Sequence, residues 1–405
     1  MKHQYQTSRS FTDLHGYLRK NRYKGYEFDD FLASPLVRLF CFNNLFLQRV
    51  AIQAGKFIPF NIRPLIGIPK LESTKARGFI AKGYLNEYLA TGEAQWLNFA
   101  EENLAWLMEH VSTGYPGKSW GNAFDFASRG GFFPKGRPTV VWTAHIAEVF
   151  DLAYRITGKP EYRGIIREAG EFVLAALDVH ADSQGICFGY APGILNLIHN
   201  SNLLGAATLM RCWQYWPEDR YLEKARKSYQ WTIADMNPDG SWYYGNEEKY
   251  KWIDNFHTAY NLDCLMTAHA IAPGEGIVLF ETIEKAYRYW IGTFFEADGA
   301  PLYYHDNKYP LNIQCAAQAI ETLARFEPYF PGSLDLARTI LGWTDAHMKK
   351  RNGAYLYEIW PAWKNNLECI HWGQSTMLAA LGAFDHHCAL KRDDIHLERE
   401  EAIPV

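Results

Sequence analysis

The chain has 405 residues, of which 48% are hydrophobic and 21% are charged, a balance that excludes a largely disordered protein. Its 41 basic and 45 acidic residues give a net charge of −4 without any basic tract, which argues against nucleic-acid binding. The N-terminus lacks the apolar stretch of a signal peptide and no run of 18 apolar residues occurs, so we expect a cytoplasmic protein.

The seven cysteines are scattered and never spaced as Cys-x-x-Cys, which predicts buried free thiols. His386-His387-Cys388 has no further ligand at a metal-site spacing, so no metal is expected. The phosphate-binding patterns G-x-x-x-x-G-K-S/T and G-x-G-x-x-G are missing, and no cofactor is predicted.

In chain order, the first apolar segment covers residues 34–53 and is predicted to be helical. Its Arg38 and Arg49 are compatible with a membrane surface. Asn43 and Asn44 interrupt the apolar face, however, so a packed helix explains the segment equally well and we do not expect membrane contact.

Two matching contexts then surround Thr91-Gly92 and Thr157-Gly158, each between two apolar-periodic segments, which indicates a repeated helical hairpin. Further along, polar residues open successive apolar segments about 57 residues apart. They are His145, Asn200, His257, Gln314 and His371. A unit of this length accommodates two helices and two connections.

The candidate inner helices begin near Lys75, Val140, Asn200, His257, Gln314 and His371. Five outer helices lie between these six, and the segment 34–53 is the expected sixth partner that closes the ring. The sequence therefore predicts an all-α fold, a single (α/α)6 toroid over 34–388. Residues 1–33 are expected to form an N-terminal extension, and 389–405 a polar C-terminal tail.

The connections that precede inner helices share a glycine followed by alternating aromatic residues. They cover 117–121, 185–189, 240–244, 299–304 and 353–357. Alternation favours short β-like arms, all entering the ring from the same end. One mouth of the toroid should therefore collect many of the aromatic side chains, which make up 16% of the chain.

The densest candidate site combines the aromatic run 242–244 with Asp254, Asn255 and His257. Sugars present apolar faces and hydroxyl edges, so stacking rings beside such polar groups suit a glycan. We expect Trp242, Tyr243 and Asn255 to bind substrate, and Tyr244, Asp254 and His257 to be catalytic. Asp254 or Asn255 alternatively caps the helix that starts there.

The next arm repeats this design with two tyrosines and polar residues, although the tyrosines are also compatible with simple packing. Its predicted binding residues are Tyr303, Tyr304, His305 and Gln314. Residues of the remaining arms and helix starts are further binding candidates: His145, Asn200, Arg63, Trp360 and Trp372.

Glu358 and His371 complete the predicted catalytic set. Glu358 with Asp254 would form a carboxylate pair of the kind used by glycosidases. A lyase or epimerase would instead need a base at a sugar carbon, such as His257 or Tyr244, and a neighbouring cation. Arg63, Lys75 and Arg77 are candidates for that cation.

Three stretches, 59–85, 240–265 and 298–323, resemble the VpsJ-like polysaccharide-biosynthesis proteins. The resemblance covers about 59–385 and implies an α/α toroid of the six-hairpin glycosidase type. It also implies a role in making or tailoring a bacterial exopolysaccharide, with an oligosaccharide or polysaccharide as substrate and other exopolysaccharide-biosynthesis proteins as partners. It supplies no catalytic residues.

Three functions follow from these observations. The first is a carbohydrate-active enzyme that hydrolyses, eliminates or epimerises a glycan. The second is a non-catalytic glycan-binding or assembly factor. The third is an isomerase similar to sugar 2-epimerases, with His257 and His371 as its histidines. Isoprenoid chemistry is disfavoured because adjacent aspartates occur only near the ends, at Asp29-Asp30 and Asp393-Asp394.

Overall fold

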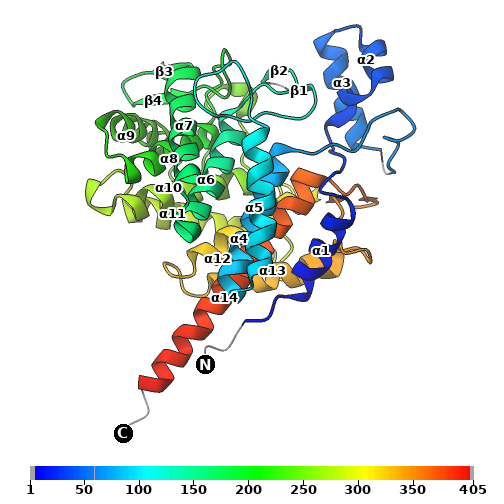
Figure 1. The fold of residues 1–405 in the computed structure, drawn as a ribbon. Helices are drawn as coiled ribbons and strands as arrows, with labels where there is room; N and C mark the ends of the chain where they lie inside the picture. The colour runs from blue at the N-terminus through cyan, green and yellow to red at the C-terminus, as the bar shows by residue number, and fades with distance from the viewer. Residues whose placement is uncertain (1–4, 59, 129, 402–405) are drawn as a thin grey trace.

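The computed structural model describes residues 5–58, 60–128 and 130–401, with side chains as far as Arg392. Its helices form two concentric layers, as predicted for a toroid (Figure 1). The inner helices are α4 (Thr74–Thr91), α6 (Val140–Thr157), α8 (His199–Tyr215), α10 (Asn255–Ile271), α12 (Ile313–Phe326) and α14 (Ser375–Glu401). The outer helices are α1 (Arg9–Lys20), α5 (Ala94–Glu109), α7 (Pro160–Ala176), α9 (Asp219–Ala234), α11 (Phe280–Thr293) and α13 (Ser333–His347).

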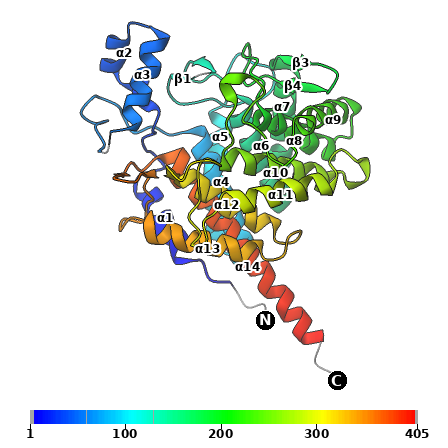
Figure 2. The same cartoon turned by 180° about the vertical axis from the view of Figure 1, so that it is seen from behind.

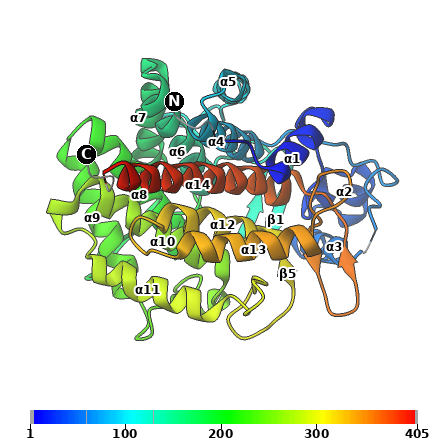
Figure 3. The ribbon, with the colours of Figure 1, turned by 90° about the horizontal axis from the view of Figure 1, so that it is seen from below.

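The inner helices contact each other in chain order, and α14 packs on α4 to close the ring. Figure 3 shows α14 lying between α4 on one side and α12 and α13 on the other. Close approach is possible because Gly83 and Gly382 face each other, and a Cβ on Gly382 would stand 2.4 Å from the Gly83 carbonyl oxygen. Small residues at the seam therefore set the spacing of these two helices.

The repeated Thr-Gly pairs end α4 and α6. Gly92 and Gly158 adopt left-handed backbone conformations, with φ of 72° and 69°, and act as helix C-caps. The hydroxyl groups of Thr91 and Thr157 each donate back to a carbonyl of the last turn, both at 2.8 Å. These pairs stop the inner helices and turn the chain toward the outer layer, as the repeat predicts.

The glycines of the five arms share one structural role. Gly117, Gly185, Gly240, Gly299 and Gly353 all have positive φ. A Cβ on any of them would meet a backbone carbonyl oxygen of the next outer helix within 2.1–2.8 Å. The first four press on α7, α9, α11 and α13 in turn. The glycine repeated in the sequence therefore marks the place where each arm packs on the outer helix of the following hairpin.

The fifth contact identifies the sixth outer helix, because Gly353 presses on the carbonyl of Asp13 in α1. Phe11 of α1 packs edge-on against Trp96 of α5, with ring centroids 5.3 Å apart. The prediction that 34–53 closes the ring, and that 1–33 is a mere extension, is therefore wrong. The physical reason is that α1 is amphipathic and buries Phe11, Leu14 and Leu18 completely.

The segment 34–53 instead forms two short helices, α2 (Pro35–Cys41) and α3 (Leu45–Lys56), which stand away from the ring (Figure 1 and Figure 2). At the other end of the chain, α14 continues to Glu401 through the expected polar tail. All seven cysteines are buried free thiols.

Short strands and single turns occupy the connections. Antiparallel pairs join β1 (Phe126–Ser128) to β2 (Gly131–Phe133) and β3 (Val179–Ala181) to β4 (Ile186–Phe188), and β6 (Glu358–Ile359) lies between β5 (Leu311–Asn312) and β7 (Lys364–Asn365). The 3-10 turns are η1 (Asp30–Ala33), η2 (Glu248–Tyr250) and η3 (Pro273–Glu275), and the π-helical turn η4 (Ile370–Gln374) leads into α14. The arms and these strands lie around the N-terminal ends of the inner helices, so this end of the ring is the mouth.

Candidate functional site

The start of α10 holds a histidine oriented by a carboxylate. Asp254 caps α10, since its Oδ1 accepts the backbone N–H of His257 at 3.0 Å. Its Oδ2 lies 2.7 Å from His257 Nδ1 and accepts the indole N–H of Trp252 at 2.9 Å. Capping and the polar role considered for Asp254 thus coincide. In the neutral imidazole, Nδ1 carries the proton and Nε2 presents its lone pair.

Aromatic rings surround this imidazole. Tyr244 lies 4.5 Å from His257 between centroids and stacks on Trp252 at the same distance. Phe256 lies 4.0 Å from His257 between centroids, and its ring in turn lies 5.6 Å from that of Trp372. The His257 side chain remains 18% exposed, although Asp254 beneath it is fully buried. A ligand at this surface would therefore meet a partly exposed imidazole within an aromatic wall.

A second polar group contacts Trp372. The ammonium of Lys75 lies over three rings, 4.5 Å from the centroid of Trp372, 5.0 Å from Trp142 and 5.5 Å from Phe79. No hydrogen bond or ion pair holds it within the described residues. Burial lowers the pKa of Lys75 to about 7, although the nearby carboxyl group of Glu27 opposes this shift.

The carboxyl group of Glu27 holds the start of η4. Its Oε1 accepts the backbone N–H of His371 at 2.6 Å, and His371 Nδ1 lies 2.9 Å from the same oxygen without hydrogen-bond geometry. Burial raises the pKa of Glu27 to about 8 and lowers the pKa of His371 to about 3. At neutral pH, His371 is therefore uncharged and Glu27 is largely protonated.

Several buried polar atoms around the mouth lack partners in the described part of the chain. They are His145 Nε2, Asn200 Oδ1, Gln314 Oε1, Glu27 Oε2, and both ring nitrogens of His371. The other amide end of Gln314 is used, since Nε2 donates to the Tyr260 hydroxyl at 2.9 Å. Native proteins rarely leave buried polar atoms unsatisfied, so this cluster points to a polar ligand or ordered water.

The expected carboxylate pair has no free oxygen. Glu358 Oε1 accepts from Asn312 Nδ2 at 2.8 Å, and Oε2 accepts from Trp360 Nε1 at 3.2 Å. Burial raises the pKa of Glu358. Both oxygens of Asp254 are likewise engaged, as described above. Asp254 and Glu358 are therefore positioned as supports of neighbouring side chains rather than as an acid and a nucleophile at a glycosidic bond.

Trp242 and Asn255 serve the packing of the ring instead of the mouth. Trp242 is 2% exposed, and its indole donates to the Thr232 carbonyl at 2.8 Å. Asn255 donates to the Leu302 carbonyl at 2.9 Å and accepts from Trp290 at 2.8 Å. With both amide ends engaged, Asn255 has no free group for a substrate, which corrects the expected binding role of both residues.

Among the described residues, Arg63, Tyr243 and His305 make no hydrogen bond, ion pair or ring contact with the imidazole of His257. Arg63 pairs with Asp30 at 2.6 Å and donates to the Glu27 carbonyl, so it holds the segment from Glu27 to Asp30 in place. Tyr243 is 38% exposed. His305 lies on the exposed side of its arm, where its Nδ1 contacts a backbone carbonyl at 3.3 Å. Tyr303, one residue before Tyr304, does reach the wall through Phe256, at 5.6 Å.

Sequence reasoning missed Trp252, Tyr260 and the segment around Glu27. Trp252 was detectable as an aromatic residue two positions before Asp254. Glu27 had no such signal, because it precedes the first repeat and reaches His371 across 344 residues. Phe28 beside it stacks on Tyr357, with centroids 5.1 Å apart. The loop after α1 thus forms part of the mouth.

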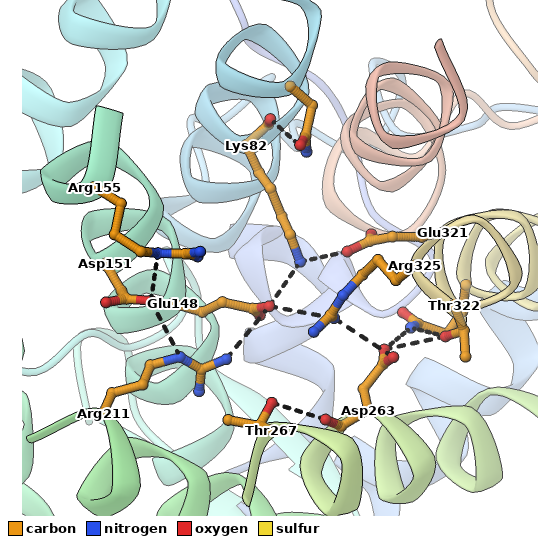
Figure 4. A network of polar contacts seen from close by, with 12 residues as sticks. Lys82, Glu148, Asp151, Arg155, Arg211, Asp263, Thr267, Glu321, Thr322 and Arg325 are labelled. Carbon is orange, nitrogen blue, oxygen red and sulfur yellow. Dashed lines mark hydrogen bonds and ion pairs between the residues drawn. The ribbon is translucent and has the colours of Figure 1, made fainter. Parts of the chain in front are cut away.

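Deeper in the ring, charged residues from the inner helices meet at the axis. Figure 4 shows Lys82 pointing at Glu148 and Glu321, with 3.2 Å between Lys82 Nζ and Glu148 Oε1. Arg211 and Arg325 approach the same Glu148 oxygen at 3.5 and 3.4 Å. A cavity beside this network is also lined by His145 and Tyr260, so the network lies directly below the mouth. Within the described residues, no cluster of three His, Cys, Asp or Glu side chains has a metal-binding arrangement.

The fold is similar to that of solved sugar epimerases, isomerases and glycoside hydrolases. A cellobiose 2-epimerase from Bacillus thermoamylovorans has a TM-score of 0.63 at 11% identity, over 79% of this chain and 88% of that one. A D-mannose isomerase matches at 0.59 and 12% identity, over 79% and 87%. An α-mannanase of glycoside hydrolase family 76 from Bacteroides thetaiotaomicron matches at 0.59 and 11%, over 80% and 87%.

These likenesses confirm the predicted (α/α)6 toroid of the six-hairpin glycosidase type, a fold shared by sugar epimerases, isomerases and glycoside hydrolases. No family model matches the sequence. No curated protein matches it either. The identities are too low to transfer an activity, which has to be argued from the side chains.

Proposed function

We propose that the protein is a sugar epimerase or isomerase that moves a proton at a carbon next to a carbonyl group. The observation that carries this proposal is the Asp254–His257 pair, in which a buried carboxylate orients an accessible imidazole. Such a pair is suited to general base catalysis because Asp254 holds Nδ1, which leaves Nε2 and its lone pair for a substrate proton. The aromatic wall around it suits the apolar face of a sugar.

In the proposed reaction, His257 Nε2 takes the proton from the carbon beside the carbonyl of an open-chain sugar. The bonding electrons move to the carbonyl oxygen, which gives an enediolate. The epimer forms when the enediolate turns its opposite face toward His257 and takes the proton back from Nε2 at the same carbon. The isomer forms when Nε2 delivers the proton to the neighbouring carbon and the hydroxyl proton of the first carbon passes to the former carbonyl oxygen. Lys75 is the candidate cation that stabilises the enediolate, since its ammonium has no protein carboxylate bound to it.

Hydrolysis is less well supported, because each carboxylate oxygen of Asp254 and Glu358 already accepts a hydrogen bond. The resemblance of three stretches to VpsJ-like proteins supports a bacterial exopolysaccharide intermediate as the substrate class, with the other proteins of that pathway as partners. We propose the cytoplasm as the place of this reaction.

The test is a turnover screen in deuterated water, with cellobiose, mannose and oligosaccharides from bacterial exopolysaccharides as substrates. Mass spectrometry should detect one deuterium in the sugar without cleavage, and the preferred substrate tests the exopolysaccharide assignment. His257→Gln should lower kcat by about 10²–10⁴-fold, as expected for loss of a general base. Lys75→Met should lower kcat with little change in KM.

His269→Gln is the matched control, because it removes an imidazole from the opposite, C-terminal end of the same helix α10 and should leave turnover unchanged. Circular dichroism of each variant establishes that the ring is folded. Full activity of His257→Gln would overturn the proposal. Addition of water across a cleaved bond would support a hydrolase instead, and glycan binding without any product would support the assembly factor.

A further inference from the structure

The hairpin formed by α2 and α3 projects from the ring beside the mouth (Figure 1). Its tip carries three phenylalanines, Phe40, Phe42 and Phe46, which are 71%, 77% and 70% exposed. More large apolar side chains are exposed on the same hairpin and the chain that follows it: Leu36, Leu39, Leu45, Leu47, Val50, Phe57, Phe60 and Leu65. Exposed apolar side chains gathered in this way mark an interaction surface.

This surface is separate from the hairpin's own packing face. Ile52 is buried against Phe31 and Leu32 of η1. A Cβ on Gly55 would stand 2.2 Å from the Phe31 ring, so α3 is pressed directly onto that turn. The hairpin therefore already has a core, and the exposed phenylalanines lie on its outer face.

The turn between the two helices explains the polar residues that interrupt the apolar segment. Phe42 and Asn43 have φ of 45° and 56°, and the Asn44 side chain caps α3 by accepting the Leu47 N–H at 3.1 Å. These asparagines build the turn, in which Phe42 is 77% exposed. They no longer argue against a membrane surface.

The charged side chains of the region are all basic, although Arg63 is buried in its pair with Asp30. Residues 31–71 contain five basic residues and no aspartate or glutamate. Arg49 has no ion pair among the described residues, and Arg38 is 61% exposed although it lies 3.3 Å from Asp125 of the neighbouring arm. A second copy of the chain would bring like charges together across such an interface, whereas anionic lipid headgroups complement them.

No helix in the described residues is long and apolar enough to cross a bilayer. With 7 and 12 residues, α2 and α3 have the length of elements that lie in the interface, their apolar side chains entering only the upper part of the acyl region.

From these observations, we propose that the α2–α3 hairpin docks the protein on an anionic lipid bilayer, with Phe40, Phe42 and Phe46 inserted and Arg38 and Arg49 facing the headgroups. Docking would hold the adjacent mouth of the ring at the membrane surface. This inference stands on the hairpin alone and does not depend on the proposed reaction.

The experiment is co-sedimentation of the full chain with vesicles of phosphatidylcholine, with and without phosphatidylglycerol. We expect binding to the anionic vesicles that weakens with salt, and a loss of about tenfold or more in Phe40→Ser/Phe42→Ser/Phe46→Ser, because three inserted rings are removed. Arg38→Gln/Arg49→Gln should reduce both the affinity and its salt dependence.

Leu279→Ser is the matched control, because Leu279 is also an exposed apolar residue, 58% exposed, and lies directly before α11, far from the hairpin in the sequence. It should bind like the unchanged chain. Circular dichroism checks that the triple variant is folded. Absence of vesicle binding, equal binding by the triple variant, or equal binding to neutral vesicles would each overturn the proposal. So would dimerisation in light scattering that the triple variant abolishes while vesicles stay unbound.

Discussion

The carboxyl group of Glu87 lies buried in the contact between α4 and α14. Burial raises its pKa to about 8, and the neighbouring Asp385 contributes to the shift. Asp385 in turn accepts from the Tyr5 hydroxyl at 3.2 Å and from the Ser8 N–H at 3.1 Å. Because the folded pKa exceeds the ordinary value of 4.5, the stabilising contribution of protonated Glu87 is complete below that value and is lost as the pH rises through 8.

Replacing Glu87 with glutamine should therefore raise the urea midpoint at pH 8 relative to the unchanged chain, and have much less effect at pH 5. The amide keeps the shape of the side chain but cannot ionise. Glu109→Gln, on the exposed face of α5, is the control and should give parallel curves. Equal midpoints for Glu87→Gln and the unchanged chain at pH 8 would contradict the buried, protonated state of Glu87.

For single residues, the sequence predicted that Asp254 and His257 act together, because a cap residue and the imidazole three positions later lie within one helical turn. It could name Lys75 only as one of several cations. The rings around Lys75 come from α4, α6 and η4, and no local pattern brings Phe79, Trp142 and Trp372 together. Contacts between distant segments, rather than residue types, were the missing information.

Among the elements, the seam between α4 and α14 depends most on small residues. Gly382→Ala should destabilise the protein by about 1–3 kcal/mol, because the new methyl group meets backbone atoms that cannot rotate away. Denaturation in urea measures the difference. Gly164→Ala in α7 is the matched control, since nothing lies within 4 Å of its added Cβ.

The control should stabilise the protein by about 0.5–1 kcal/mol through helix propensity. If both substitutions changed stability equally, close packing at Gly382 would not be the cause.

The 57-residue repeat located the inner helices closely, because polar residues mark their starts. It did not identify α1 as the sixth outer helix, since α1 lies before the first repeat and its contact with the Gly353 arm spans nearly the whole chain.

For the whole molecule, Glu148 is the residue on which the hairpins converge. Burial alone would raise the pKa of Glu148, but Lys82, Arg211 and Arg325 together hold it well below its usual range. These cations belong to α4, α8 and α12, so one carboxylate links four inner helices. The all-helical toroid itself was predictable from the repeat, whereas this axial network was not, because each member is a single charge within an apolar helix.

Glu148→Gln should destabilise the protein by about 3–5 kcal/mol, because it leaves buried cations without their counter-charge. Thermal unfolding measures this loss. Glu223→Gln, on the exposed side of α9, should have no comparable effect. Because the folded pKa of Glu148 lies below its unfolded value, the contribution should persist at pH 5 and be lost only in strong acid. A loss that is complete at pH 5 would contradict this role.

Closure of the ring by α1 and α14 has a consequence for how the protein is made. The hydrogen bond from Tyr5 to Asp385 joins residues 380 positions apart, and one flank of α4 is covered by α14, which is synthesised after the other helices of the ring. A growing chain therefore remains an open crescent on the ribosome, with the apolar sides of its first hairpin exposed to chaperones. A chain that stops before Ser375 would lack α14. It would not form a smaller ring, because α4 and α12 would both be left without their shared neighbour.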